Sequence, residues 1–257
     1  MQEQKSTVKQ SDAVWTEQEN KVDPLGDGIS SIELVRSSGT DLDIANAARV
    51  SYGRLSHEVS ERDVKLINFL MEHNHASPFE HNQLSFRIKC PMFVARQWMR
   101  HRMHSYNEIS YRYVKVKTEF YVPKEWRMQD KVNGQSSYGG FKDEDMTKAY
   151  QASVDAAYEQ YTKMLEAGVC REQARAILPV ATYTEFIFTT NLRSLLHFME
   201  LRLGHGAQKE IREYAKGLLQ LSLPHFPISL KAWQKFRLTG EEWEDQLAEW
   251  TEQLGDK

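Results

Sequence analysis

Residues 83–110, QLSFRIKCPMFVARQWMRHRMHSYNEIS, change their apolar pattern at Pro91. Before the proline, apolar and polar side chains alternate from Leu84 to Cys90, which predicts a strand with one buried face. After it, apolar side chains recur at helical spacing over residues 91–103, and proline suits the first turn of a helix. The stretch therefore predicts a strand that runs directly into a helix.

The other segments predict helices and short strands in an irregular order. Extended chain is expected at 31–37, 108–123 and 181–190, a loop at 127–143, and helices at 40–52, 60–74, 143–167, 171–178, 191–203 and 207–222. This order lacks the regular strand–helix–strand rhythm of a doubly wound sheet. We therefore expect an α+β (mixed α/β) fold, with a central sheet and flanking helices.

Three predicted helix ends carry specific local signals. Ser60 stands three residues before Asp63, which is the arrangement of a capping box. Asn191 is a favourable N-cap residue, and Gly168 suits the end of a helix.

The composition divides the chain into three parts. Residues 1–28 are polar and poor in aliphatic side chains, which predicts a flexible extension. Residues 29–236 contain the predicted strands and helices, and they are long enough to form a single domain with its own core. Residues 237–257 predict an acidic, helical tail.

Length, charge and cysteine content disfavour several classes of protein. The 257 residues carry a formal net charge of −3 with a pI near 6.3, so there is no general attraction to nucleic acids. No apolar run approaches the roughly 18 residues of a membrane span, and no signal peptide is visible. Cys90 and Cys170 form neither a metal-type pair nor a disulfide framework, which favours a reduced, cytoplasmic setting.

Residues 100–110, RHRMHSYNEIS, concentrate arginines, histidines, serines and a glutamate in one short segment. Such donors suit a metal site, a nucleic-acid-binding patch or a pocket for a phosphorylated small molecule. We predict no metal, because His101 and His104 stand among arginines that repel a divalent cation. Two rival classes remain open: an RNA-binding module, suggested by RYVKVK at 112–117, and a zinc-dependent nucleotide hydrolase.

The same segment places Arg100, His101 and Arg102 seven residues before Ser110. This R-H-R-x7-S pattern resembles the signature of the flavin-dependent thymidylate synthases. Other segments resemble that family in the same order: ASPFEHNQLSFRIKCPMFVARQWMRHR, NEISYRY, REQARAILP and NLRSLLHFMELR. The likeness spans about residues 30–236.

The resemblance implies that residues 29–236 are a catalytic domain with the fold of that family. The enzyme would convert dUMP to dTMP, with methylenetetrahydrofolate as the carbon donor and NADPH, through FAD, as the reductant. It would be a homotetramer with shared active sites, acting on small molecules without nucleic acid or membrane partners. The family uses no cysteine nucleophile, which implies that neither cysteine of this chain is needed for the chemistry.

The resemblance also assigns residues to the two ligands. The residues assigned to dUMP are Gln97, Trp98, Met99, Arg100, Glu108, Ile109, Ser110, Tyr111, Arg112, Arg175 and Arg202. The residues assigned to FAD are Ser77, Glu80, Arg100, His101, Arg102, Met103, Asn107, Glu108, Asn191, Leu192, Arg193 and His197, with Ser51 as a weaker candidate. Arg202 matches the arginine that helps to ionise the pyrimidine and is the predicted catalytic residue. Arg175 would reach the phosphate from a neighbouring subunit. Ser110 is the rival nucleophile, but no base that would activate it is evident.

The chain departs from the family pattern at two places, and one helix raises a geometric question. Tyr111 stands where the family often has glycine, and LGHGAQ places His205 one position early. Arg193 and His197 are four residues apart and share a helix face, whereas Arg202 lies about 140° further round. We therefore expect Arg202 to face a different ligand or a neighbouring active site.

Overall fold

The computed structural model describes residues 20–132, 134–239 and Trp243. Its main sheet is antiparallel, with five strands in the order β1-β2-β3-β7-β4, and β5 and β6 form a separate hairpin. The strands are β1 (Lys21–Val22), β2 (Ser31–Ser38), β3 (Gln83–Pro91), β4 (Ser105–Glu108), β5 (Trp126–Gln129), β6 (Ser137–Phe141) and β7 (Tyr183–Thr190). The helices are α1 (Asp41–Arg49), α2 (Glu61–Glu72), α3 (Met92–Trp98), α4 (Glu144–Glu166), α5 (Arg171–Ala174), α6 (Leu192–Leu203), α7 (Lys209–Ser222) and α8 (Pro227–Arg237). Short 3-10 helices cover Val50–Tyr52, Ser77–Glu80 and Arg175–Ile177.

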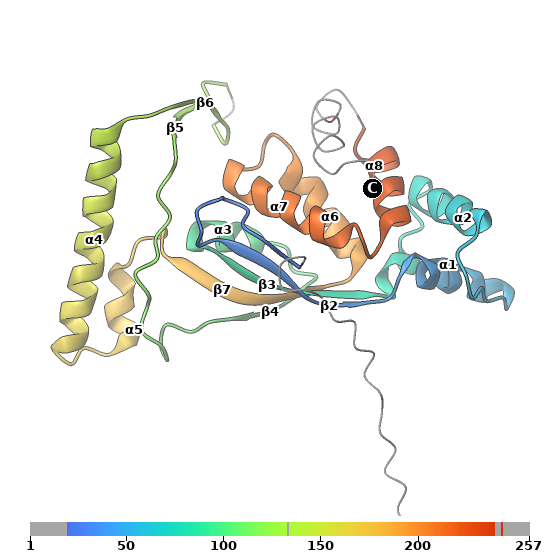
Figure 1. Ribbon diagram of the computed structural model, residues 1–257, viewed down its shortest axis with the longest axis horizontal. Coiled ribbons are helices and arrows are strands. Elements are labelled where there is room, and N and C mark those ends of the chain that lie inside the picture. Colours follow the sequence, from blue (N-terminus) through green and yellow to red (C-terminus); the bar gives the residue numbers. More distant parts are fainter. Residues whose placement is uncertain (1–19, 133, 240–242, 244–257) are drawn as a thin grey trace, which may run out of the picture.

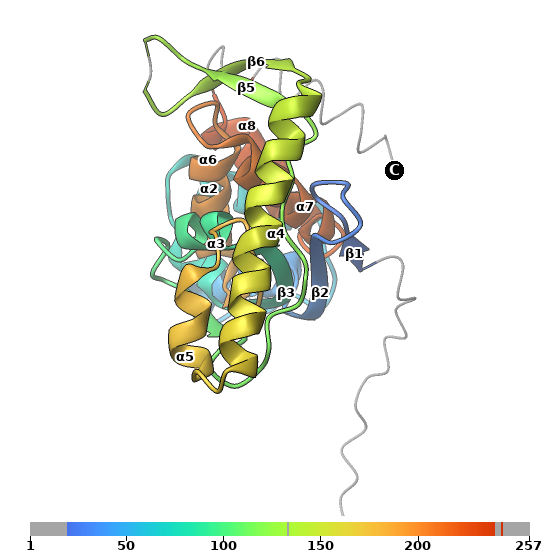
Figure 2. The ribbon, with the colours of Figure 1, turned by 90° about the vertical axis from the view of Figure 1, so that its left-hand side faces the viewer.

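The helices are distributed unevenly around the sheet. Helices α3, α6 and α7 lie over one of its faces, while α1 and α2 lie at one end of the molecule and α4 and α5 at the other (Figure 1). Figure 2 shows α4 running beside α5, with the β5–β6 hairpin near the other end of α4. The expected α+β fold with a central sheet and flanking helices is confirmed.

Strand β3 occupies the centre of the sheet, between β2 and β7. Leu84, Phe86, Ile88 and Cys90 are all fully buried on one face, which confirms the predicted alternation. On the other face, Arg87 forms an ion pair with Glu185 of β7. The strand is therefore held by a packed apolar face and a partly exposed polar one.

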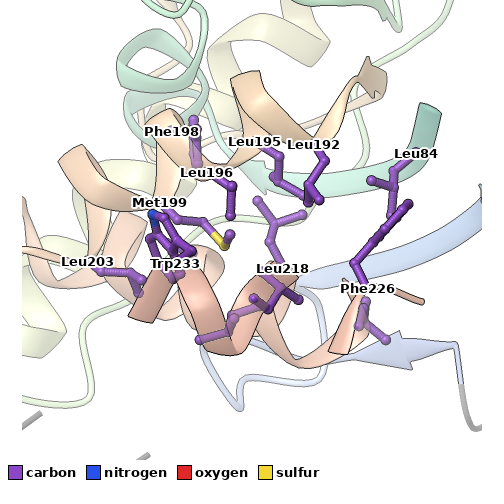
Figure 3. Packing of buried hydrophobic residues seen from close by; sticks show 14 of the residues in the cluster. Leu84, Leu192, Leu195, Leu196, Phe198, Met199, Leu203, Leu218, Phe226 and Trp233 are labelled. Atoms are coloured by element: carbon purple, nitrogen blue, oxygen red, sulfur yellow. The ribbon is translucent and has the colours of Figure 1, made fainter. Parts of the chain in front are cut away.

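The main core lies between this sheet and the helices above it. Apolar residues of α6, among them Leu195, Met199 and Leu203, pack near Leu218 of α7 and Trp233 of α8 (Figure 3).

Helix α7 approaches the sheet closely at Gly217. A Cβ atom there would lie 2.7 Å from Ile32 Cδ1 and 2.9 Å from Val22 Cγ2, closer than real side chains allow. Glycine thus permits α7 to seat against β1 and β2.

The last residue of α3, Trp98, is fully buried in an aromatic cluster. Its ring contacts Phe186 and Phe188 of β7, Phe198 of α6 and Tyr214 of α7, with centroids 4.9 to 5.8 Å apart. Aromatic pairs at such distances add to the stabilisation from burial. Trp98 therefore fixes the C-terminal end of α3 against three other elements.

A smaller core forms at the other end of the molecule. Its buried members are Tyr111, Val116, Tyr161 and Ala174, so it joins the chain after β4 to α4 and α5. Helix α4 has 23 residues, yet its only buried ones are Val154 and Tyr161. Most of this helix is therefore not covered by the rest of the described chain.

The predicted helix ends are confirmed. Ser60 and Asp63 form the capping box of α2, and Asn191 Oδ1 accepts from the backbone N–H of Ser194 at 2.9 Å. Gly168 follows α4 with φ of 87°, a conformation that glycine adopts without strain.

Two predictions around residues 100–123 were wrong. The helix expected over 91–103 ends at Trp98, and the strand expected over 108–123 ends at Glu108. Past β4 the backbone N–H groups of Tyr113 and Val114 turn back to donate to Ser110 O. Glu108, Ser110 and Arg112 therefore do not share one side of a strand.

Two further elements were not foreseen. The loop expected over 127–143 contains most of the β5–β6 hairpin. Helix α8 begins with the N–H groups of Ile228 and Ser229 donating to the carboxylate of Asp41, at 2.8 and 3.0 Å. Its cap comes from 187 residues earlier in the chain, where no local pattern can reveal it.

The chain ends are described in part. Residues 20–28, expected to be flexible, include β1, which pairs with β2, so the folded chain begins before residue 29. Residues 1–19 of the expected extension, and all of the expected tail after 239 except Trp243, lie outside the described residues. Trp243 itself is buried against the main core.

Replacement of Trp98 tests the aromatic cluster. We expect Trp98→Ala to lower the free energy of unfolding by about 3–5 kcal/mol, the usual cost of removing a buried large aromatic ring. Trp98→Phe should cost clearly less, because Trp98 Nε1 has no hydrogen-bond partner among the described residues and phenylalanine removes this buried donor. Denaturant titrations at one protein concentration measure both values, and equal losses for the two variants would contradict the prediction.

Candidate active site

A cavity of about 870 Å³ opens along α6. It is bounded by residues 100–104, by the chain following α2, and by Trp233 and Arg237 of α8. Its volume is that of a typical site for a small molecule or cofactor. Five arginines and two glutamates line it: Arg100, Arg102, Arg193, Arg202 and Arg237, with Glu80 and Glu200.

The turn that follows α3 brings the histidine of the R-H-R segment to the cavity wall. Tyr106 donates its hydroxyl to His101 O at 2.8 Å and to Trp98 O at 3.3 Å. The His101 side chain turns inward and is 8% exposed, whereas Arg100 and Arg102 are exposed. The end of the helix at Trp98 thus sets which of these side chains points in.

Arg202 is fixed by two acceptors from the α3 region. Its Nε donates to His101 Nε2 at 2.9 Å, and its Nη2 donates to Gln97 O at 3.2 Å. Burial, with the nearby Arg202, lowers the pKa of His101 to about 4, so its ring is neutral near pH 7 and Nε2 can accept. Burial and the positive charge of Arg100 lower the pKa of Arg202, but a guanidinium stays protonated.

His104 is a second, half-buried histidine of the cavity and was not assigned a role from the sequence. Its Nδ1 lies 2.8 Å from Thr190 Oγ1, and burial lowers its pKa to about 4. Its ring centroid is 6.2 Å from that of His101. Its spacing of three residues from His101 was the available clue.

The acidic residues of the cavity neutralise some of its arginines and leave others free. Glu80 pairs with Arg193, while Glu200 pairs with Arg237 at 3.3 Å. Arg100, Arg102 and Arg202 have no carboxylate partner in the described part of the chain. The cavity is therefore electropositive, which suits a phosphorylated ligand.

Most residues assigned to FAD surround this cavity. Glu80, Arg100, His101, Arg102, Met103, Asn191, Arg193 and His197 all line it. Ser77, Asn107, Glu108, Leu192 and the weaker candidate Ser51 do not. Leu192 is fully buried, and Glu108 accepts from Thr184 Oγ1 at 2.5 Å.

The residues assigned to dUMP fall into two groups, of which only Arg100 and Arg202 line the cavity. Gln97, Trp98 and Met99 lie behind them at the end of α3. The second group, Glu108, Ile109, Ser110, Tyr111, Arg112 and Arg175, follows the chain from β4 to the 3-10 turn after α5. No residue of this second group reaches the cavity of the same chain.

The second group is organised by α5 and the smaller core. Arg112 forms an ion pair with Glu172 at 3.0 Å, and Arg175 lies exposed one turn after Glu172. Tyr111, which departs from the family pattern, is buried and donates its hydroxyl to Tyr183 O. Tyr111 is therefore a residue of the smaller core in this chain.

We expected Arg202 to face a different ligand, or a neighbouring active site, from Arg193 and His197, and this stays a prediction. All three line the same cavity, together with Ser194, Glu200 and Leu201. The cavity wraps around much of α6, and a long arginine side chain reaches back along the helix surface. The expectation was drawn from the directions of the Cα–Cβ bonds, which do not include the reach of a long side chain.

The alternative nucleophiles lack activating partners in the described part of the chain. No histidine or carboxylate bonds to Ser110 Oγ, which lies 3.4 Å from the backbone nitrogen of Arg112. Burial raises the pKa of the Cys90 thiol, which disfavours a reactive thiolate, and Cys170 is an exposed free thiol.

The described residues offer neither a metal-binding cluster nor a membrane-spanning helix. No group of three or more histidine, cysteine, aspartate or glutamate side chains is arranged to hold a metal ion. None of the helices seen in residues 20–239 has the length and apolar character needed to cross a bilayer.

Several cavity residues were missed from the sequence. Leu70, Met71, Asn74 and Phe79 come from the end of α2 and the chain beyond it, and Trp233 comes from α8. They are apolar or small polar side chains that look like ordinary core and turn residues. No local pattern distinguishes them.

Several known proteins are similar to this chain in sequence. Residues 33–228 match the family described as "Thymidylate synthase complementing protein". The flavin-dependent thymidylate synthase of Thermus thermophilus is 44% identical over 209 residues, covering 81% of this chain and 77% of that protein. The one from Kosmotoga olearia is 42% identical over 215 residues, covering 82% and 92%.

A solved structure resembles the fold as well. The UMP/dUMP methylase PolB from Streptomyces cacaoi, bound with 5-Br dUMP, aligns with a TM-score of 0.74 at 34% identity, over 80% of this chain and 94% of that one. The family match covers well over half of the chain, and the relatives are matched over most of their length. This chain belongs to the family of flavin-dependent thymidylate synthases.

Proposed function

We propose that this protein converts dUMP to dTMP, with 5,10-methylenetetrahydrofolate as the carbon donor and NADPH, through FAD, as the reductant. The observation that carries the proposal is the electropositive cavity in which Arg202 is fixed by His101 and Gln97. The family membership supports the same reaction. The substrates are small molecules, and we expect a cytoplasmic enzyme without nucleic acid or membrane partners.

The cavity fits FAD by size and by chemistry. Arg100 and Arg102 have no carboxylate partner in the described chain and are suited to the diphosphate, since arginine pairs well with phosphate oxygens. Asn191, Arg193 and His197 add polar groups along α6. When bound and reduced by NADPH, the flavin would supply the hydride that completes the methyl group.

Arg202 is the proposed catalytic residue. Uracil is a poor carbon nucleophile, and its C5 becomes more nucleophilic when N3 gives up its proton and negative charge spreads over N3 and the adjacent carbonyl. A guanidinium held by two acceptors in a partly buried site can stabilise that charge without reorganising. Neutral His101 contributes as the acceptor that orients Arg202.

The second group of nucleotide residues supports a homotetramer with shared active sites. Arg112 and Arg175 suit a phosphate, yet they lie around α5 and not at the cavity of their own chain. Helix α4 beside them has few buried residues. We propose that α4 and α5 pack against a neighbouring subunit and bring Arg112 and Arg175 to its cavity.

Arg202→Ala tests the proposed reaction and the catalytic residue together. The wild type should bind flavin and form dTMP from dUMP, methylenetetrahydrofolate and NADPH. Arg202→Ala should bind FAD but lose about 10²–10³ in the rate of dTMP formation, as is typical when a charge-stabilising donor is removed. Oxidation of NADPH by oxygen should be largely kept.

Ser110→Ala is the matched control, because it removes the rival nucleophile from the same protein. It should keep measurable turnover. A wild type that makes no dTMP and binds no flavin would contradict the proposed function. An active Arg202→Ala beside an inactive Ser110→Ala would reverse the assignment of roles.

Arg175→Ala tests whether sites are shared. The variant should bind dUMP more weakly by about 1.5–3 kcal/mol, the range for a charged hydrogen bond, and should still bind FAD. Tetramers mixed from Arg175→Ala and Arg202→Ala subunits should regain part of the activity, since some sites would combine intact residues. Mixed tetramers, verified by mass, that stay inactive would count against sharing.

His101 predicts a specific dependence of stability on pH. Its pKa in the fold is about 4, below the ordinary 6.5, so the unfolded chain takes up the proton first as pH falls. The stability that the fold gains from neutral His101 is complete above pH 6.5 and is lost as the pH falls from 6.5 to about 4. In flavin-free protein, His101→Gln keeps an acceptor but cannot titrate, so its melting temperature should fall less steeply across this window. Parallel curves for wild type and variant would refute the assignment.

A further inference from the structure

A buried carboxylate lies outside the cavity, at the start of α7. Glu210 is 4% exposed and is surrounded by donors. Its Oε1 accepts from the Tyr121 hydroxyl at 2.8 Å, Arg127 Nη2 lies 2.9 and 3.0 Å from its two oxygens, and Gln208 Nε2 donates to Oε2 at 2.8 Å. Both oxygens are therefore engaged.

Glu210 stays ionised in this setting. Burial by itself would raise its pKa, but hydrogen bonds from Tyr121 and Gln208 and the charge of Arg127 bring the pKa below its ordinary value. An ionised carboxylate can only accept hydrogen bonds. Every group that faces Glu210 must therefore present a donor to it.

This constraint passes through Gln208 to Gln97. The NH2 group of Gln208 is committed to Glu210, so its oxygen faces the other way and accepts from Gln97 Nε2 at 2.5 Å. The NH2 group of Gln97 is therefore engaged by the oxygen of Gln208. Because amide oxygen and nitrogen have similar shapes, shape alone does not decide which way an amide points. Here the carboxylate of Glu210, which only accepts, decides the orientation of both amides.

The hydrogen bonds that link Glu210, Gln208 and Gln97 form a relay. This relay leaves one atom without a partner among the described residues. No described residue donates to Gln97 Oε1, although the residue is only half-exposed. The backbone oxygen of the same residue accepts from Arg202 Nη2, so Gln97 adjoins the proposed catalytic group. Its side-chain carbonyl is thus an unused acceptor on a residue that adjoins Arg202.

We propose that Glu210 is a positioning residue for the nucleotide, which acts through Gln208 to present Gln97 Oε1 to a hydrogen-bond donor of dUMP. The proposal rests on the proposed function, in which Arg202, bonded to the backbone oxygen of Gln97, acts on the uracil ring. The ring N3–H and the sugar 3′-hydroxyl are the donors that dUMP offers. Glu210 itself touches no ligand, and its effect is to set the direction of two amides.

Glu210→Gln tests the relay because it reverses the polarity. Glutamine at 210 can keep its oxygen towards Tyr121 and Arg127 and turn its NH2 to Gln208. Gln208 would then turn its own NH2 to Gln97, and Gln97 would show an NH2 group to the nucleotide. We expect dUMP to bind the flavin-loaded variant about tenfold more weakly or worse, by calorimetry, with FAD affinity and melting temperature little changed.

Tyr121→Phe is the matched control. It removes one hydrogen bond from Glu210 in the same buried site but leaves the carboxylate and the relay direction intact. Its dUMP affinity should stay within about twofold of the wild type. If Glu210 served only to hold the fold together, the two variants would share any loss of stability and of dUMP affinity.

A compensating change separates amide direction from general damage. In the Glu210→Gln background, Gln97→Glu accepts from Gln208 on one side and from the nucleotide on the other, so it should restore most of the lost affinity. Should Glu210→Gln destabilise the tetramer, Gln208→Leu frees the Gln97 amide with the Tyr121 and Arg127 contacts kept, and should still weaken dUMP.

The outcomes distinguish the relay from the function on which it rests. A wild type with no affinity for dUMP would overturn both. A wild type that binds dUMP, with Glu210→Gln equal to Tyr121→Phe or tighter than the wild type, would overturn the relay alone. Measurements with 3-methyl-dUMP and 3′-deoxy-dUMP identify the donor, since the analogue that lacks it should bind wild type and Glu210→Gln alike. If both analogues still bound the wild type and Glu210→Gln with different affinities, the relay would be wrong.

Discussion

The burial of Trp98 is the constraint on which the site depends. Its ring is enclosed by aromatic side chains of β7, α6 and α7, so the last turn of α3 cannot move independently of the sheet or of these helices. The chain must then turn sharply, with Tyr106 binding the carbonyl of His101. Gln97 and His101, on either side of the tryptophan, meet Arg202 as a result. A hydrophobic anchor thus places the polar groups that we propose for the reaction.

Much of the fold could be predicted from periodicity and from caps. The alternation in β3 and the caps at Ser60 and Asn191 are local properties, and each was confirmed. The errors have non-local causes. Helix α3 stops early because tertiary contacts hold Trp98 and His101, and α8 is capped by Asp41 from the other end of the chain. Neither cause leaves a pattern in the neighbouring sequence.

The candidate site divides in the same way. The resemblance supplied most of the arginines and histidines that line the cavity, and the structure brings most of the residues assigned to FAD together there. It could not supply the bond between Arg202 and His101, which depends on how far an arginine reaches back along α6. Nor could it supply His104 or the chain from Glu210 to Gln97. The bond between Gln97 and Gln208 joins residues 111 positions apart, which no local pattern reveals.

We propose that Arg202 meets the pyrimidine inside the cavity while the phosphate is held from a neighbouring subunit. A crystal structure of the tetramer with FAD and dUMP tests it most directly. The account predicts FAD along Arg100, Arg102 and α6, the uracil ring edge within hydrogen-bond distance of Arg202, and the phosphate beside Arg175 of a neighbouring subunit. Arg202 turned away from the uracil, with the phosphate bound only by arginines of the same chain's cavity, would contradict the account.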